Sequence, residues 1–280
     1  MHQNQFVKGV KEIEGPLFTG EPDQELCEPK AAKAFISVIM SLAYALLTRS
    51  DISIYLLAMQ KFVQKPQYLH VRKLNGVLRW AEKNPKAFTY KHMACAKKIE
   101  VHSDTGFRRE ENEEGDVGGK AIRGVNIIRL GQQISEVNGV VSFICHLIDW
   151  IIGAIKVVVR STFTVETHGV ITGADHSICI ALTFHEIDCG PVSLTVARNL
   201  TEYSGVTFSI HCVTDARNLL LILRNVNMKN PAEKNFIVHL LWLKNKLENC
   251  VIKKLIWTDT RDMTADGHTK GSIRRTAIHA

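Results

Sequence analysis

Hydrophobic side chains in the first third of the chain recur every three or four residues, which is the spacing of an amphipathic helix. Phe35, Val38 and Leu42 have this spacing in the first such segment. A second segment follows Asp51, which we expect to be its N-cap. The pattern predicts a helical segment over residues 33–92.

From residue 98 the pattern changes to an alternation of apolar and polar residues, which is typical of half-buried strands. Longer stretches with helical spacing separate the later strands. The pattern predicts strands at 98–104, 121–130, 140–148, 207–215 and 251–258, and helices at 164–185, 216–224 and 231–247, with a short helix in the tail. The apolar run 139–159 as a whole reads as two adjacent buried strands.

Three successive strands followed by alternating helices and strands define the expected fold class. Such an order predicts an α/β protein with a mixed sheet, antiparallel at one edge and parallel at the other. We therefore expect a five-stranded mixed sheet flanked by helices over residues 96–280. The helical segment 33–92 precedes it, and residues 1–32, in which prolines and glycines interrupt charged residues, read as a tail or linker.

Composition narrows the class of protein only moderately. The 280 residues are 45% hydrophobic and 22% charged, which is ordinary for a globular protein, and the net charge of +7 permits a nucleic-acid partner without requiring one. The seven cysteines include no CxxC pair, which argues against a disulfide framework or a zinc cluster. The longest apolar run is interrupted by His146, Asp149 and Lys156, so we expect no membrane span and a cytoplasmic location.

Four acidic residues occupy positions where chemistry often collects in α/β folds. Asp104 and Asp215 each end a predicted strand, Glu166 lies in the first turn of the predicted long helix, and Asp266 follows the last strand. Carboxylates that converge in one cleft repel one another, and Mg²⁺ is their natural counter-charge. The alternative is that they are ordinary helix caps and turn formers.

The helical segment contains two short motifs. Residues 35–44 form a stretch rich in small residues that ends in Tyr44, and residues 48–53 read Thr-Arg-Ser-Asp-Ile-Ser. These motifs resemble the end of a copia-type retrotransposon reverse transcriptase, which has a small-residue helix with Tyr and a Thr-Arg-Pro-Asp-Ile pattern, although Ser50 replaces the proline here. Residues 71–80 resemble the helix that follows in these polyproteins. The Tyr-x-Asp-Asp-type motif of a polymerase site is not present in the sequence, so we expect no polymerase activity.

The remainder of the chain resembles the RNase H domain of the same polyproteins. Residues 102–107 are similar to its Ser-Asp-Ala motif, 160–166 to the motif of the second acid, and 265–271 to the closing Ala-Asp-x-x-Thr-Lys motif. Residues 213–215 occupy the third position. Each motif is weak alone, but the order of the motifs, over roughly residues 33–275, is fairly specific.

This resemblance implies an RNase H-like fold that cleaves the RNA strand of an RNA–DNA hybrid. Asp104, Glu166, Asp215 and Asp266 would then be the catalytic residues and would hold two Mg²⁺ ions, or Mn²⁺ as an alternative. The expected partners are the hybrid, a polymerase and other parts of the same polyprotein. A virus-like particle or the nucleus would then be an alternative location to the cytoplasm.

Departures from the family pattern leave a second function open. Apolar residues fill 151–155, where the family often has a polar stretch, and Val165 replaces the usual alanine before the second acid. The chain could therefore be a catalytically inactive module that only binds a hybrid or packs against a polymerase. An integrase-type acid triad on the same fold is a third alternative, which the local motifs favour less.

Further candidates concern substrate binding. His268 could assist proton transfer or product release, or be only a polar turn residue. Trp150 and Trp257 could stack on bases, although core packing is the more common role. Basic residues could contact the nucleic-acid backbone or be only solvated surface charges; they are Lys156, Arg160, Arg217, Lys270, Arg274 and Arg275. The sequence contains no P-loop, HExxH pair or GxSxG elbow.

Overall fold

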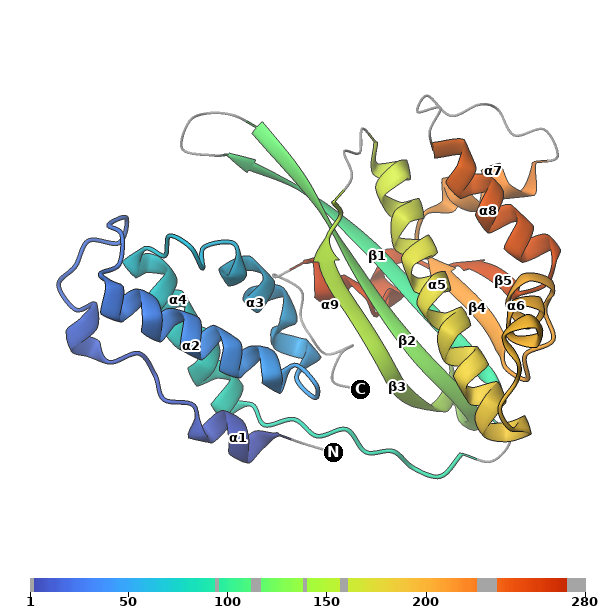
Figure 1. The fold of residues 1–280 in the computed structure, drawn as a ribbon, viewed down its shortest axis with the longest axis horizontal. Coiled ribbons are helices and arrows are strands. Elements are labelled where there is room, and N and C mark those ends of the chain that lie inside the picture. The colour runs from blue at the N-terminus through green and yellow to red at the C-terminus, as the bar shows by residue number, and fades with distance from the viewer. Residues whose placement is uncertain are drawn as a thin grey trace. The chain divides into compact units, whose positions relative to one another are not determined.

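The computed structural model describes residues 3–93, 96–111, 117–137, 140–156, 161–225 and 236–270. The chain forms two compact units, Met1–Tyr90 and Lys91–Ala280, which are described separately (Figure 1). Arg160, Arg274 and Arg275, three of the basic residues predicted to contact nucleic acid, lie outside the described residues. None of the described helices is both long and apolar enough to cross a membrane.

The first unit is a small helical assembly. Its helices are α1 (Asn4–Gly9), α2 (Pro29–Ala45), α3 (Ser53–Gln60) and α4 (Tyr68–Lys83), with 3₁₀ turns η1 (Gly15–Leu17) and η2 (Ser50–Ile52). The apolar positions that predicted the helices form its core. Phe35 and Leu42 of α2 pack with Leu74 and Leu78 of α4, and all four side chains are fully buried.

The described residues of the expected tail or linker, 3–32, pack as part of this unit. Val7 and Ile13 are buried in the core of the first unit. The Ile13 amide donates to Asn75 Oδ1, and Asn75 Nδ2 donates back to the Ile13 carbonyl, both at 3.0 Å. The prolines and glycines that suggested a linker therefore shape turns around a packed segment.

Asp51 does not cap α3, as the sequence suggested. It lies in η2, where its carboxylate accepts two hydrogen bonds from the fully buried Arg49 side chain, from Nε and from Nη2, each 3.0 Å long. Arg49 Nη1 also donates to the carbonyl of Ala81 at the end of α4, at 2.7 Å. The Thr-Arg-Ser-Asp motif thus connects the loop after α2 to α4.

The second unit is built on one five-stranded sheet. Its strands are β1 (Lys98–Glu111), β2 (Val117–Val137), β3 (Val140–Ala154), β4 (Ser209–Thr214) and β5 (Ile252–Trp257), in the order β3-β2-β1-β4-β5. Strand β2 is antiparallel to both β1 and β3, whereas β4 is parallel to both β1 and β5. The expected α/β class is confirmed, with a mixed five-stranded sheet that is flanked by helices.

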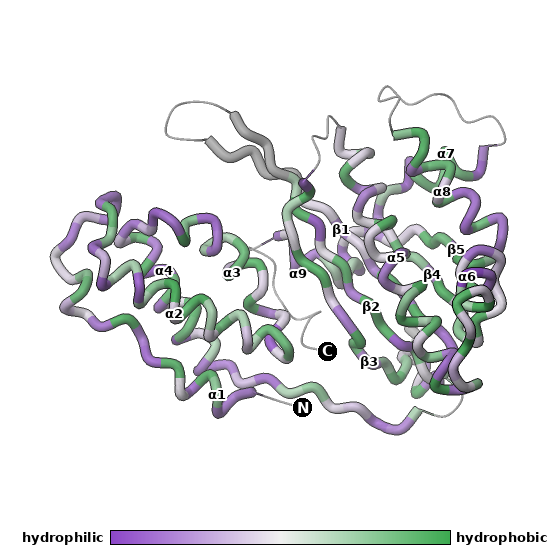
Figure 2. The backbone as a smooth tube through the Cα atoms, viewed as in Figure 1, coloured by the Kyte–Doolittle hydropathy of each residue, from purple (hydrophilic) through white to green (hydrophobic). Residues whose placement is uncertain are grey.

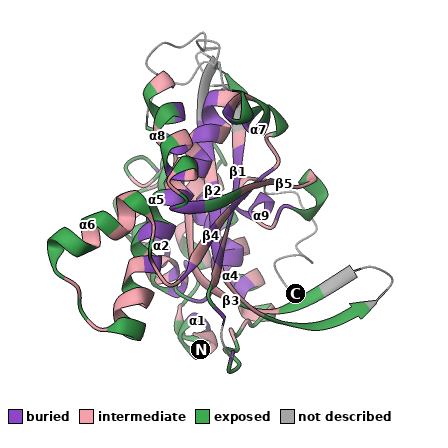
Figure 3. Cartoon of the chain, turned by 90° about the vertical axis from the view of Figure 1, so that its right-hand side faces the viewer, coloured by how far each residue is buried: buried purple, intermediate pink, exposed green. Residues whose placement is uncertain are grey.

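Five helices and a 3₁₀ turn accompany the sheet in the described residues of this unit. They are α5 (Thr162–Cys189), α6 (Leu194–Tyr203), α7 (Arg217–Arg224), α8 (Ile237–Glu248), η4 (Thr260–Asp262) and α9 (Asp266–Thr269). The long α5 packs on β1, β2 and β4, and α8 packs against α5 (Figure 1). Together they cover the apolar core of the sheet, where the buried strand segments meet α5 (Figures 2 and 3).

Glycines allow helices to approach the two faces of the sheet closely. A Cβ on Gly173 of α5 would lie 2.5 Å from Val101 Cγ1 and 3.0 Å from Val125 Cγ1. Gly124 precedes Val125 on β2, and a Cβ on Gly124 would lie 2.6 Å from His268 Cβ, next to α9. Because consecutive strand residues face opposite sides, α5 and α9 pack on opposite faces of the sheet.

Three features of the second unit differ from the sequence expectations. The described part of the run 139–159, residues 140–156, holds one strand, β3, and not two, because its apolar residues continue a single ladder with β2 as far as Ala154. The hairpin of β1 and β2 is longer than expected, since the charged residues up to Glu111 still pair. Helix α6 was missed because none of its residues is buried.

Candidate functional site

Asp104 and Asp215 are brought together by the parallel pairing of β1 and β4. The last pair of this ladder is Ser103 with Thr214, so the two aspartates are the next residues on neighbouring strands. Contrary to expectation, β1 does not end at Asp104: it continues beside β2, where Asp104 pairs with Gly124. The relevant edge is therefore the point where β4 stops and β1 loses its parallel partner.

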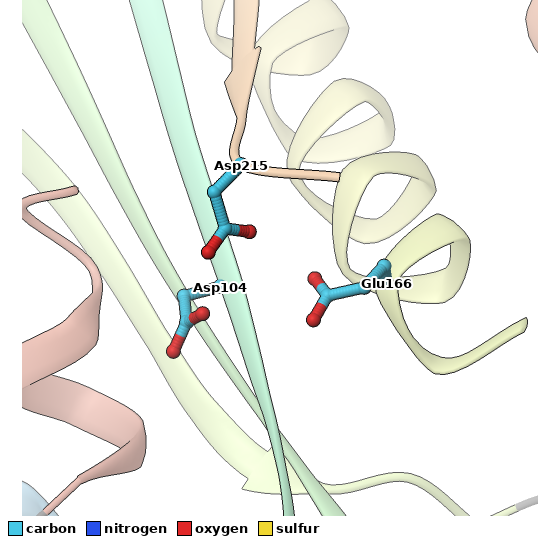
Figure 4. Close-up of side chains that lie close together, drawn as sticks. All are labelled: Asp104, Glu166 and Asp215. Atoms are coloured by element: carbon cyan, nitrogen blue, oxygen red, sulfur yellow. The ribbon is translucent and has the colours of Figure 1, made fainter. Parts of the chain in front are cut away.

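Glu166 is the third member of the site and comes from α5. It lies just beyond the first turn of this helix, which begins two residues earlier than predicted, with Ser161 as its N-cap; Ser161 Oγ accepts a hydrogen bond from the Thr164 amide at 3.1 Å. The side chains of Asp104, Glu166 and Asp215 point toward one another (Figure 4). One carboxylate oxygen of each lies within 4.8 Å of the corresponding oxygens of the other two.

Neighbouring hydroxyl groups orient the two aspartates. Thr269 Oγ1 donates to Asp104 Oδ2, and Thr260 Oγ1 donates to Asp215 Oδ2 at 2.9 Å. The indole Nε1 of Trp257 also donates to the Asp215 carbonyl oxygen at 3.0 Å. The two carboxylates are thus held by threonines that follow β5 in the sequence, and the Asp215 backbone is held by the residue that ends β5.

Asp266, the fourth predicted acid, is not part of the converging group. It begins α9 and is buried, and its Oδ1 lies 2.6 Å from the ammonium Nζ of Lys270. The same ammonium is 3.8 Å from Asp104 Oδ1. Although burial alone would lower it, the ion pair with Asp266 raises the pKa of Lys270. Lys270 is therefore a counter-ion within the site and not a free contact for nucleic acid.

His268 is buried and contacts the sheet. Its side chain is 1% exposed, and its Nε2 lies 2.7 Å from Asn126 Oδ1 on β2. This contact holds α9 against the sheet and so positions Asp266, Thr269 and Lys270. The geometry favours a positioning role for His268 over the proton transfer suggested by the sequence.

Burial and mutual repulsion raise the pKa values of two carboxylates of the site, those of Glu166 and Asp104. Burial, together with the charges of Asp104 and Asp215, raises the pKa of Glu166 to about 8. Burial and the neighbouring Asp266 and Asp215 carboxylates raise the pKa of Asp104 to about 6, against the Thr269 hydrogen bond and the charge of Lys270. The Thr105 hydroxyl near Glu166 and the charge of Lys270 act in the opposite direction, but they do not outweigh burial and the neighbouring carboxylates.

This arrangement fits a hard divalent cation. The donor set is three carboxylates with converging oxygens, and Glu166 Oε2 is buried without a hydrogen-bond donor among the described residues. Mg²⁺ and Mn²⁺ prefer such oxygen ligands. A divalent charge at this point would relieve the repulsion that raises both pKa values.

The electrostatics predict how stability depends on pH and metal. Because the folded-state pKa values of Asp104 and Glu166 are raised to about 6 and about 8, the metal-free fold favours their protonated forms. Stability should therefore fall as pH rises from about 4 to about 8. Added Mg²⁺ should raise the melting temperature, and more at pH 8 than at pH 5.5, because binding requires ionised carboxylates.

Calorimetry across this pH range, with Mg²⁺ and with EDTA, measures both effects. A Glu166→Gln variant serves as the control: it should show a weaker pH dependence and a smaller Mg²⁺ effect than the natural chain. Equal stabilisation by Mg²⁺ at both pH values would contradict a carboxylate site.

The remaining predicted residues lie around the site or apart from it. Arg217, the first residue of α7, is exposed two positions after Asp215, and Lys156 is exposed after β3. Trp257 is 47% exposed, so it does not have the core role that was the more common expectation. Trp150 is half-buried on β3. The sequence did not single out Thr260, Thr269 or Asn126, because isolated polar residues give no pattern.

Comparison with known proteins yields a likeness to solved structures alone. No family model matches the chain, and no curated protein matches it. Among solved structures, the chain is similar to the N-terminal RNase H domain of a Mycobacterium tuberculosis protein, solved as a fusion with maltose-binding protein. The two chains are 12% identical, the match covers 65% of this chain and 96% of the other, and the TM-score is 0.33.

Proposed function

We propose that the second unit is a metal-dependent endoribonuclease that cleaves the RNA strand of RNA–DNA hybrids. The observation that carries this proposal is the convergence of Asp104, Glu166 and Asp215, which come from β1, α5 and the end of β4. The order of the RNase H-like motifs in the sequence supports it independently, since three of those motifs contain these acids.

The chemistry follows from the donor set. Divalent ions held here would activate a water molecule and stabilise the leaving oxygen of a phosphodiester. Asp104, the most buried acid, would be the central ligand, and Glu166 and Asp215 would bind from either side. Thr269 and Thr260 keep the two aspartates oriented, so little rearrangement is needed on binding.

Asp266 completes the proposed site as a fourth ligand. Its carboxylate is engaged by Lys270, so a second ion near Asp266 would have to displace that ammonium. Lys270 is half-exposed and sits at the end of a four-residue helix, which allows its side chain to move toward solvent. We propose a two-ion site in which Asp266 would help to hold the second ion once the Lys270 side chain has turned toward solvent.

We also propose the wider context that the sequence resemblance implies. The chain would be the C-terminal part of a copia-type Pol polyprotein, acting in reverse transcription beside a polymerase, in the cytoplasm or a virus-like particle. The ordered motifs of both units support this assignment. The Arg49–Asp51 pair gives the Thr-Arg-Ser-Asp motif of the first unit a structural role.

A cleavage assay tests the enzymatic proposal. A hybrid with end-labelled RNA should be cut internally in Mg²⁺ or Mn²⁺ and remain intact in EDTA. Duplex DNA and single-stranded RNA of the same sequence should not be cut. Cleavage that persists in EDTA would count against the proposal, and so would cleavage of RNA that is not paired with DNA.

The alternative is a catalytically inactive module that only binds the hybrid. The ion pair of Lys270 with Asp266 is the observation that favours it, since this ammonium already neutralises part of the acidic site. Both functions predict hybrid binding, so only the Mg²⁺-dependent cut separates them. Binding without cleavage by a folded protein would establish the alternative.

A further inference from the structure

A groove between α7 and the edge strand β5 lies beside the acidic site. It has a volume of about 610 Å³. Its lining combines basic, apolar and aromatic side chains: Arg217, Leu220, Leu221, Arg224, Lys254, Leu255, Ile256 and Trp257. Trp257 pairs with Thr214 in the sheet, so one end of the groove adjoins Asp215.

The charge of this groove suits a polyanion. Arg217, Arg224 and Lys254 are all exposed, and none of them forms an ion pair with another described residue. No acidic residue is among those that line the groove. Three unneutralised cations along one groove are the arrangement that binds a phosphate backbone.

The apolar part of the lining indicates a single strand. Trp257 is 47% exposed, and its indole nitrogen is fixed by the hydrogen bond to the Asp215 carbonyl oxygen, so its ring is held in place. Leu221 is 53% exposed on the α7 side. Duplex bases are stacked on each other and present mainly phosphates, whereas an unpaired base can stack on an aromatic ring.

We propose that this groove binds single-stranded RNA that continues from the strand held at the acids. Arg217, Arg224 and Lys254 contact phosphates, and Trp257 stacks on a base next to the site. The inference rests on the proposed function, because the acids define which strand enters the groove. It assigns Arg224 and Lys254, which the sequence did not mark, to nucleic-acid binding.

Two neighbouring lysines on β5 provide a matched test. Lys254 lines the groove, whereas Lys253 is equally exposed but does not. Binding of labelled oligouridine to the full chain is measured in EDTA by fluorescence anisotropy over a range of salt. Lys254→Ala should reduce the slope of log affinity against log salt by about 0.7, the value for one phosphate contact to a single strand, and Lys253→Ala should not.

Trp257 tests the stacking component. Trp257→Ala should weaken binding roughly 5- to 150-fold, and Trp257→Phe should restore most of the affinity. Phenylalanine cannot donate to the Asp215 carbonyl, so its rescue distinguishes stacking from the loss of that hydrogen bond. Circular dichroism of each variant confirms that the fold persists.

The outcomes separate this inference from the proposed function. Failure of the chain to bind oligouridine, equal effects of the two lysine changes, or no loss with Trp257→Ala would each overturn the groove assignment, even if hybrid is cleaved. Loss of single-strand binding with Lys254→Ala and Trp257→Ala supports the groove. If hybrid cleavage is absent while these binding effects appear, the nuclease proposal fails and the groove remains.

Discussion

Asp104→Asn is expected to abolish metal-dependent cleavage while making the metal-free protein more stable. Asp104 is the most buried of the three converging acids. Its carboxylate accepts a hydrogen bond from Thr269 and lies 3.8 Å from the ammonium group of Lys270. Loss of one such charged group should slow cleavage by about 10²- to 10³-fold, because electrostatic stabilisation by a single preorganised group is commonly worth that much.

The stability effect has the opposite sign. The raised pKa of Asp104, about 6, means that its charge opposes folding at neutral pH. Asparagine keeps the shape without the charge, so the free energy of unfolding at pH 8 in EDTA should rise by about 1–3 kcal/mol. A purely structural role for Asp104 would give the reverse result, with stability lost.

Asp188→Asn is the matched control. Asp188 lies near the C-terminal end of α5, far from Glu166 along the helix, and forms a surface ion pair with Lys97 at 3.3 Å. Such pairs contribute about 0–1 kcal/mol, so this change should leave both cleavage and stability nearly unaltered. If the Asp104→Asn variant cleaves the hybrid as fast as the Asp188→Asn control, Asp104 has no role in the reaction.

The sequence could predict the elements whose residues must be buried. Strand alternation and helical spacing located β4, β5 and α5, because each places an apolar row against the core. The same signal missed α6, which has no buried residue, and split β3 into two, because β-branched residues continue through its centre. Local patterns report burial, and an element that buries nothing leaves no trace in them.

The sequence predicted the three converging acids but not the surroundings that decide their chemistry. Asp104 and Asp215 could be paired because parallel strands align their ends at a common edge. Whether Asp266 would join them depended on where the Lys270 ammonium lies, and no spacing rule fixes a side-chain ion pair. The groove beside Trp257 depends on the packing of α7 against β5, which local patterns do not report.

Arg49→Met is expected to destabilise the first unit by about 3–5 kcal/mol, the range for breaking a buried ion pair. Arg49 is fully buried, and its guanidinium forms two parallel hydrogen bonds with Asp51 and a third with the Ala81 carbonyl. It also lies over the Trp80 ring, 5.8 Å from its centroid. Methionine fills similar space but leaves the Asp51 charge buried without this partner.

Hydrogen exchange of the full chain localises the effect. Amides of α4 should lose protection while those of α5 keep it, because Arg49 connects η2 to the end of α4 within the first unit. Arg79→Met is the matched change on the surface: Arg79 pairs with Glu12 at 2.8 Å, with both side chains exposed, and should cost at most about 1 kcal/mol.

The double variant Arg49→Met with Asp51→Leu separates the cost of taking Arg49 away from Asp51 from the net contribution of the Arg49–Asp51 pair. Since apolar replacement of a whole buried pair is often neutral, it should recover much of the stability lost in the single variant. Full recovery would mean that the Thr-Arg-Ser-Asp motif matters for the geometry it imposes and not for net stability. If the double variant is as unstable as the single one, the hydrogen bond to Ala81 is the main contribution of Arg49.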